Sequence, residues 1–127
     1  MGKARIWGWA SALAVMSCAP PAWATMDNFK AFKQTYPGKN ASLYSCKTCH
    51  QHAIGRKGDL NPYGVSLEKA AGADTANKLT EANFKAVEKE DADSDGVSNL
   101  DEINAGTNPG DPASVPAKGG SNQPQTK

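Results

Sequence analysis

Several residue types are scarce in this chain, and most of them are missing after residue 24. All three tryptophans fall within the first 24 residues, and no methionine follows Met26. Beyond residue 24 the only cysteines are Cys46 and Cys49, which share one short stretch with both histidines. A closed zinc site needs four ligands, usually arranged as two separated pairs of Cys or His. Because there is one such cluster and no second, a structural zinc site is excluded.

Neither sign of charge dominates the chain, which has 14 Lys and Arg against 13 Asp and Glu. Proteins that bind nucleic acid concentrate basic residues into a patch or stripe. The balance therefore gives no reason to expect nucleic acid as a partner. Sustained alternation of polar and apolar residues, which marks β-strands, is also missing, and there is no internal repeat. We therefore predict an all-α fold.

The first part of the chain, 1–24, has the pattern of a secretory signal peptide. Lys3 and Arg5 precede an apolar run, which is followed by Ala-Trp-Ala at 22–24, the small-x-small pattern that signal peptidase cleaves. The run is shorter than the about 20 residues that a bilayer-spanning helix needs. We therefore predict a periplasmic or secreted protein without a transmembrane segment. A lipid anchor at Cys18 is the alternative, because the residues before it loosely resemble a lipoprotein processing box.

The rest of the chain predicts one small domain built from about four short helices. Apolar residues recur there at helical spacing, and capping or breaking residues flank the segments. Asn61 followed by Pro62 is typical of a helix start, and Gly72 of a helix end. The predicted helical segments are 27–36, 61–72, 80–89 and 98–105.

Two further features concern how this domain is stabilised and where it ends. From residue 25 onward there are seventeen bulky apolar residues, a thin core for this length, so a cofactor or metal is expected inside. The last segment, 111–127, has three prolines, two glycines and no aromatic residue. It can bury too little surface to offset the entropy of ordering, so we predict a disordered tail after a domain at 25–110.

The stretch CKTCH at 46–50 matches C-x-x-C-H, the attachment signature of c-type haem. Two cysteines at this spacing, Cys46 and Cys49, can each reach one vinyl group on the same porphyrin edge, and His50 then becomes the proximal iron ligand. A redox disulfide is the alternative, but such pairs open a helix after a strand, and no strand pattern precedes this one. We predict one covalent haem c. The side chains expected to pack against it are Phe29, Phe32, Tyr63, Leu67 and Phe84.

The sixth iron ligand is left open by the sequence. Many c-type cytochromes use a methionine tens of residues beyond the motif, and this chain has none there. His52 lies two residues from His50, too close for both to reach opposite faces of one iron. Met26 lies upstream, next to the predicted mature start, where a frayed terminus is expected. A lysine or a water molecule could also bind the iron on this side, or the position could stay open.

The stretch DADSDGVSNLDE at 91–102 fits the calcium-loop template of oxygen donors at positions 1, 3, 5 and 9, glycine at 6 and glutamate at 12. Three aspartates within five residues repel one another unless a cation is bound. The alternative is a solvated acidic cap between two helices. We predict one structural Ca²⁺. Its ligands would be Asp91, Asp93, Asp95, the Val97 carbonyl, Asn99 and Glu102.

The haem motif, the sequence LNPYG at 60–64, and the acidic loop followed by AGTNPGDPAS at 105–114 together resemble a family of small exported bacterial monohaem cytochromes. That family carries a thrombospondin type 3-like or EF-hand-like calcium loop in its C-terminal part. The resemblance spans about residues 43–116. It implies a cytochrome c-like domain around one haem, with Asn61 and Tyr63 near the haem edge, and redox work whose partners it does not name.

We therefore expect an electron carrier, not an enzyme, with redox proteins as its partners. Lys47, Arg56 and Lys57 are candidate docking charges for an acidic partner. A haem-based sensor or small-ligand binder is the alternative, because no methionine follows the motif. A peroxidase would need a distal His and Arg, and the best available pair, His52 with Arg56, lies on the wrong side of the motif. A calcium-dependent scaffold subunit is a further alternative.

Overall fold

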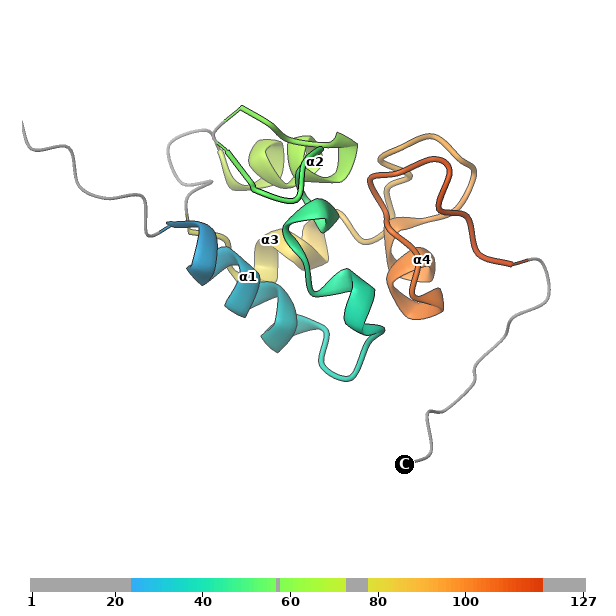
Figure 1. Ribbon diagram of the computed structural model, residues 1–127, viewed down its shortest axis with the longest axis horizontal. Helices are drawn as coiled ribbons and strands as arrows, with labels where there is room; N and C mark the ends of the chain where they lie inside the picture. Colours follow the sequence, from blue (N-terminus) through green and yellow to red (C-terminus); the bar gives the residue numbers. More distant parts are fainter. Residues whose placement is uncertain (1–23, 57, 73–77, 118–127) are drawn as a thin grey trace, which may run out of the picture.

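The computed structural model describes residues 24–56, 58–72 and 78–117 of the chain (Figure 1). Four predictions fall wholly or partly outside these described residues. They concern the signal peptide up to residue 23, the lipid anchor at Cys18, the docking charge of Lys57 and the tail at 118–127.

Helices form most of the described part. The four α-helices are α1 (Ala24–Thr35), α2 (Pro62–Ala71), α3 (Glu81–Ala86) and α4 (Asn99–Ala105). Two 3-10 helices, η1 (Ala41–Leu43) and η2 (Cys46–Thr48), follow α1 along the chain. The described ranges contain no strand, only an isolated bridge between His50 and Leu60. The all-α prediction is therefore confirmed, and none of the described helices has the length and apolar character needed to cross a membrane.

Local capping explains where α2 and α4 begin. In α2 the Asn61 side chain accepts a hydrogen bond from the Gly64 N–H at 2.9 Å, and Gly72 follows the last turn. The helix α4 follows its cap, Ser98, and ends at Gly106, whose φ of 83° lies in the left-handed region that glycine favours. The predicted boundaries of α2 and α4 are confirmed to within about one residue.

The other two helices differ in extent from the predictions. The helix α1 begins at Ala24, three residues before the predicted start at residue 27. The helix α3 follows Thr80, the first residue of the predicted segment 80–89, but ends at Ala86. After Ala86 the chain continues in turns, because the N–H groups of Val87, Glu88 and Glu90 donate to carbonyls three residues back and not four. The carbonyls of Glu88 and Glu90 then accept from the first residues of α4 at 3.0 and 2.7 Å.

The core lies where α3 packs against both α1 and α2 (Figure 1). The Phe32 ring is 5.2 Å from Tyr36 and 5.7 Å from Phe84, centroid to centroid, which joins α1 to α3. The buried apolar residues are Phe32, Tyr36, Leu43, Tyr63, Leu67, Phe84, Val87 and Ile103. Of the five side chains expected to pack against a porphyrin, Phe29 is half-buried. The other four are buried: Phe32, Tyr63, Leu67 and Phe84.

The connection from α1 to α2 holds the C-x-x-C-H stretch against this core. The Tyr44 hydroxyl donates a hydrogen bond to the Tyr36 carbonyl at 2.7 Å, and the buried Thr48 hydroxyl donates to the Leu43 carbonyl at 2.6 Å. Cys49 packs against the buried cluster. Contacts with residues that precede α2 therefore hold the C-x-x-C-H stretch in place.

Candidate functional site

The C-x-x-C-H residues, 46–50, form one tight turn, which is called the attachment turn below after the predicted haem attachment. The N–H groups of Cys49 and His50 both donate to the Cys46 carbonyl, at 3.2 and 2.9 Å, which closes the turn at η2. Cys46 and Cys49 are half-buried free thiols. Burial raises the pKa of the Cys49 thiol to about 12, and the nearby Cys46 adds to this shift. Redox-active C-x-x-C pairs usually follow a strand in a βαβ unit, and in the described residues the chain before this turn contains only helices and turns.

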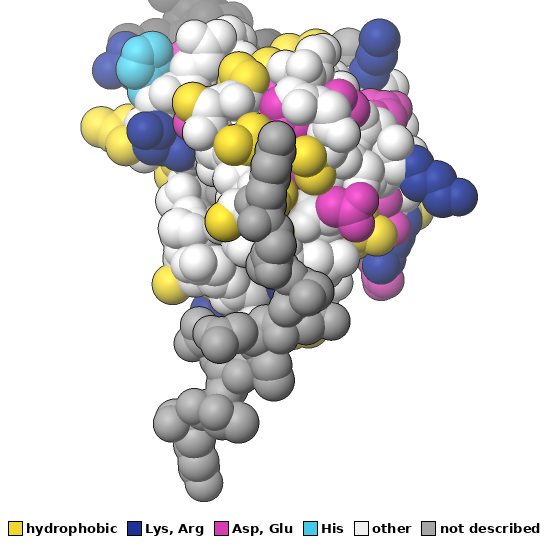
Figure 2. Space-filling view, turned by 90° about the vertical axis from the view of Figure 1, so that its right-hand side faces the viewer, with side chains coloured by type: hydrophobic (Ala, Val, Ile, Leu, Met, Phe, Trp, Pro, Cys, Tyr) yellow, Lys and Arg dark blue, Asp and Glu magenta, His cyan; other side chains and the backbone are white. Residues whose placement is uncertain are grey.

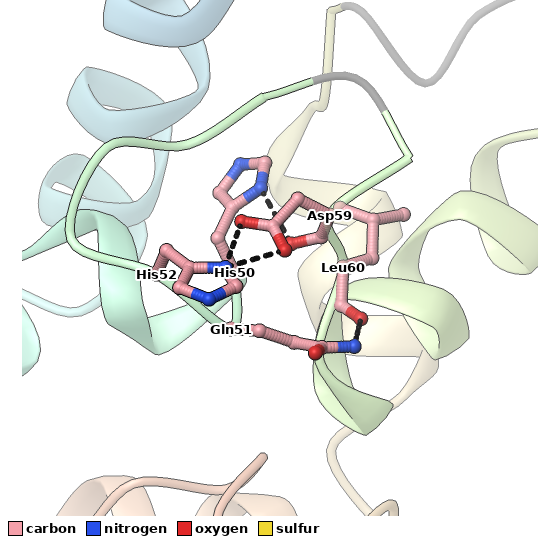
Figure 3. Close-up of polar contacts among 5 residues, drawn as sticks. All are labelled: His50, Gln51, His52, Asp59 and Leu60. Carbon is pink, nitrogen blue, oxygen red and sulfur yellow. Dashed lines mark hydrogen bonds and ion pairs between the residues drawn. The ribbon is translucent and has the colours of Figure 1, made fainter.

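His50 is oriented by the loop that follows it (Figure 3). Its Nδ1 lies 3.1 Å from the backbone carbonyl oxygen of Asp59. A carbonyl can only accept, so Nδ1 carries the proton and Nε2 keeps its lone pair free for a metal. Histidines that bind metals usually have this arrangement, because the second hydrogen bond fixes the tautomer and the ring plane.

Gly55 packs against the same imidazole. A Cβ at position 55 would lie 2.7 Å from His50 Cδ2, 2.8 Å from Nε2 and 3.1 Å from Cγ. Such similar distances to three ring atoms place Gly55 over the face of the ring and not in line with the Nε2 lone pair, which lies in the ring plane. Glycine therefore lets the loop cover His50 while leaving its free nitrogen able to bind a ligand.

His52 contacts the same residue as His50. Its Nδ1 lies 2.8 and 3.0 Å from the two carboxylate oxygens of Asp59, and Figure 3 shows both imidazoles directed at this one residue. The His52 side chain is 75% exposed. Met26, the other named candidate for the sixth ligand, is 62% exposed on α1. Both candidates are therefore on the surface of the described structure, and His52 already has a partner.

Hydrogen bonds from Asn61 connect the attachment turn to the start of α2. Its Nδ2 donates to the carbonyls of Lys47 and Thr48, both at 3.0 Å, while its backbone N–H donates to the Cys49 carbonyl at 3.1 Å. Gly64, one turn into α2, allows this approach, because a Cβ there would collide with the Cys49 carbonyl oxygen. The motif LNPYG thus has a structural explanation. The family resemblance implies that Asn61 lies near a haem edge, but it does not predict these contacts.

Replacing Asn61 with alanine is expected to lower the free energy of unfolding by about 2 kcal/mol. The loss combines a helix cap worth about 1 kcal/mol with the buried Thr48 carbonyl, which loses its Asn61 donor at about 1 kcal/mol, whereas the Lys47 carbonyl still accepts from Asn108. Urea denaturation of the purified protein measures it. Glu68→Ala, an exposed substitution on the same helix, is the control and should change stability by less than about 0.5 kcal/mol. Equal losses in the two variants would contradict the role of Asn61.

A second polar site lies between α3 and α4. Asp91, Asp93 and Asp95 each offer a carboxylate oxygen, and these atoms lie within 4.8 Å of one another. The loop is shaped around them, since the Asp91 oxygens accept from the N–H groups of Asp95 and Gly96 at 3.1 and 2.9 Å. Gly96 has a φ of 93°, as the sharp turn at position 6 of a calcium loop requires.

Glu102, on α4, is the most unusual group in this site. It is fully buried, at 0% exposure, and neither of its carboxylate oxygens has a hydrogen-bond partner. Burial raises the pKa of its carboxyl to about 8, and the charges of Asp93, Asp95 and Asp91 add to the shift. Buried Oδ2 atoms of Asp93 and Asp95 are without partners too. Buried polar groups in folded proteins are almost always paired, and these oxygens are the groups that a cation bound in this loop would pair.

Asn99 and Val97 have further contacts within the loop. The buried Asn99 side chain donates to the Val87 carbonyl at 2.8 Å and accepts from the Ala92 N–H at 3.1 Å. Asn99 therefore joins the start of the loop to α4, a role that its predicted place as a ligand did not suggest. The Val97 N–H donates to Asp95 Oδ1 at 2.8 Å.

No family model, curated protein or solved structure matched this chain.

The two sites have donor sets that fit different groups. Hard carboxylate oxygens in a flexible loop suit Ca²⁺, and the acidic loop supplies four such side chains. Figure 2, viewed from the side of α4, shows Asp and Glu in the upper part and at the right of this face, with Lys and Arg mainly toward its edges. Two thiols and an imidazole with a free Nε2 suit a covalently attached haem.

One buried hydroxyl also fits a haem beside the attachment turn. Tyr63 is fully buried, and its hydroxyl lies near the Tyr36 hydroxyl, which donates to Glu88 Oε1 at 3.1 Å. Burial raises the pKa of this hydroxyl, and the nearby Cys49 contributes, which places Tyr63 close to the attachment turn. A porphyrin carries carboxylates that accept hydrogen bonds, so Tyr63 is a suitable donor for one.

Proposed function

We propose that this chain is an exported monohaem c-type cytochrome that carries single electrons between partner proteins. The observation that carries the proposal is the C-x-x-C-H turn whose histidine donates from Nδ1 to the Asp59 carbonyl. Cys46 and Cys49 would hold the haem through thioether bonds, and His50 Nε2 would bind the iron. A haem held in this way supplies an iron that alternates between the ferric and ferrous states.

The surrounding residues position the turn and limit its motion. Asn61 ties the turn to α2, Gly55 covers the His50 ring, and the Asp59 carbonyl fixes the ring plane. Such rigidity suits electron transfer, in which a ligand set that does not rearrange keeps the energetic cost of each redox change low. The proposal includes no catalytic role, because His52 is held by the Asp59 carboxylate on the loop that follows His50.

We also propose a structural Ca²⁺ in the loop 91–102, bound by the carboxylates of Asp91, Asp93, Asp95 and Glu102. The Val97 carbonyl and Asn99 are the remaining proposed ligands. The support is the buried, unpartnered carboxylate of Glu102 beside the aspartate cluster. Redox proteins with acidic surfaces are the proposed partners. Lys47 and Arg56 are both exposed, and Ile54 is 74% exposed on the same loop as Arg56, which suits docking by charge with a small apolar centre.

The second candidate function is binding of a small ligand by the haem. It is favoured by the exposure of both Met26 and His52, the two side chains considered as sixth ligands. An open sixth position would bind carbon monoxide readily.

A redox titration of the purified holoprotein, followed by optical spectra, distinguishes the two functions. A reversible one-electron transition and a reduced spectrum that carbon monoxide leaves unchanged are expected for the electron carrier. A reduced spectrum that shifts on adding carbon monoxide would favour the ligand binder. Absence of any Soret band in protein matured in a host that assembles c-type cytochromes would refute both.

A further inference from the structure

The segment after α4 turns back onto the attachment turn. Figure 1 shows residues 106–117, in orange-red, rising beside α4 and passing between the acidic loop and the turn that contains η2. Asn108 Nδ2 donates to the Lys47 carbonyl at 3.1 Å, across 61 residues of sequence. Pro109 is fully buried, and a Cβ on Gly110 would collide with the Asn61 side chain. The Lys47 carbonyl thus accepts from both Asn61 and Asn108.

This segment is held together by its own hydrogen bonds. The Asn108 N–H donates to Ser114 Oγ at 2.9 Å, and the Asp111 N–H donates to the Asn108 carbonyl at 3.1 Å. The Gly110 N–H donates to Asn108 Oδ1 at 3.1 Å. Because Asn108 uses both ends of its side chain, it fixes the segment internally and attaches it to the haem turn at the same time. Residues 111–114, predicted as the start of a disordered tail, therefore belong to an ordered turn.

The other end of the segment is attached to the acidic loop. The Thr107 N–H and hydroxyl both donate to the carbonyl of Glu102, at 2.9 and 3.3 Å. Glu102 is the residue whose buried carboxylate has no partner. A cation bound by that carboxylate and the aspartates would hold α4 against the loop, and the Glu102 carbonyl would carry this restraint to Thr107. Asn108, the next residue, donates to the Lys47 carbonyl in the attachment turn.

We propose that Asn108 couples the acidic loop to the haem-attachment turn, so that binding of a divalent cation at 91–102 makes the turn at 46–50 more rigid. The inference rests on the proposed calcium site, and it adds a regulatory role to a site that would otherwise only stabilise the fold. Asn108 is a positioning residue here, since it contacts neither the cation nor the haem.

Amide hydrogen exchange of the purified holoprotein, with calcium and with a chelator, tests the coupling. Calcium is expected to slow exchange of the Cys49 and His50 amides about tenfold, within the usual range of coupling between sites. In Asn108→Ala the slowing at these amides should fall below about twofold, although calorimetry still detects calcium binding. Gly110→Ala places a Cβ against the side chain of Asn61, which donates to the same Lys47 carbonyl. It should also reduce the effect of calcium on exchange at these amides.

The matched control is Asn104→Ala. Asn104 is exposed on α4 and accepts from Lys39 Nζ at 2.8 Å, without touching the attachment turn. Its variant should keep the full calcium effect. The proposal is contradicted if Asn108→Ala also keeps the full calcium effect. It is contradicted as well if calcium binds the wild type without changing amide exchange at 46–50. Protein that carries no haem would refute the proposed function alone, because exchange at these amides can be measured on it in the same way.

Discussion

Replacing both Cys46 and Cys49 with alanine is expected to abolish covalent haem attachment. Wild-type protein matured in a host that assembles c-type cytochromes should have the mass of the polypeptide plus one haem, and the double variant the mass of the polypeptide alone. The physical reason is that a thioether bond needs a cysteine sulfur, and the turn at η2 presents these two beside His50. Intact-mass spectrometry and the Soret absorbance after denaturation measure the outcome.

The control for this result is Ser45→Ala. Ser45 precedes η2 and makes no capping hydrogen bond through its side chain. The variant changes the same turn without removing a sulfur, and it should carry haem at the wild-type level. A double cysteine variant that retained haem through denaturation would contradict the assignment, and so would wild-type protein without added mass.

Replacing Glu102 with glutamine is expected to change stability in opposite directions with and without calcium. In a chelator at about pH 9 the variant should be more stable by about 2 kcal/mol or more, because it removes a buried negative charge that has no partner. At a calcium concentration about 100 times the dissociation constant, the wild type gains about 2.7 kcal/mol from binding. The variant should gain much less, since it has lost the carboxylate of position 12. Thermal unfolding under the two conditions measures both effects.

The pH dependence of the chelated wild type follows from the same group. Glu102 has a pKa raised from 4.5 to about 8 in the fold, so the folded chain binds this proton more tightly than the unfolded chain. Its stabilising contribution is therefore complete below pH 4.5 and is lost as the pH rises through 8. The glutamine variant has no proton to lose and should show a flatter profile in this range.

Glu90→Gln provides the matched control, because it removes one negative charge from an exposed residue next to the loop. It should leave the sign of the calcium effect unchanged. If Glu102→Gln and Glu90→Gln behaved alike in the presence and absence of calcium, Glu102 would not be a ligand.

Features that depend on neighbouring residues could be predicted from the sequence. Asn61, Thr80 and Ser98 cap their helices through bonds to residues a few positions away. Gly72 and Gly106 end two helices, where an ordinary side chain would disfavour the backbone. The C-x-x-C-H turn and the spacing of the aspartates are local in the same sense. Each of these features depends only on how far apart its residues are in the sequence, so it can be predicted without knowing the fold.

Contacts across the chain could not be predicted in this way. The carbonyls of Glu88 and Glu90 accept from the first residues of α4, and Asn108 donates to the Lys47 carbonyl, 61 positions away in the sequence. Asn99 was predicted as a ligand from its place in a template, but its amide also ties the loop to α3. Which of several short polar side chains makes such a contact depends on which backbone groups the packed helices bring near it.

By itself, the sequence determined the helical class, most helix ends and the presence of two chemically distinct motifs, because these follow from local spacing and capping. Tertiary structure alone decided that Glu102 is buried without a partner, that Asn61 holds the attachment turn, and that the segment after α4 connects the two motifs. Burial and long-range hydrogen bonding are properties of the packed chain, since they depend on what surrounds a residue in space and not on its neighbours in sequence.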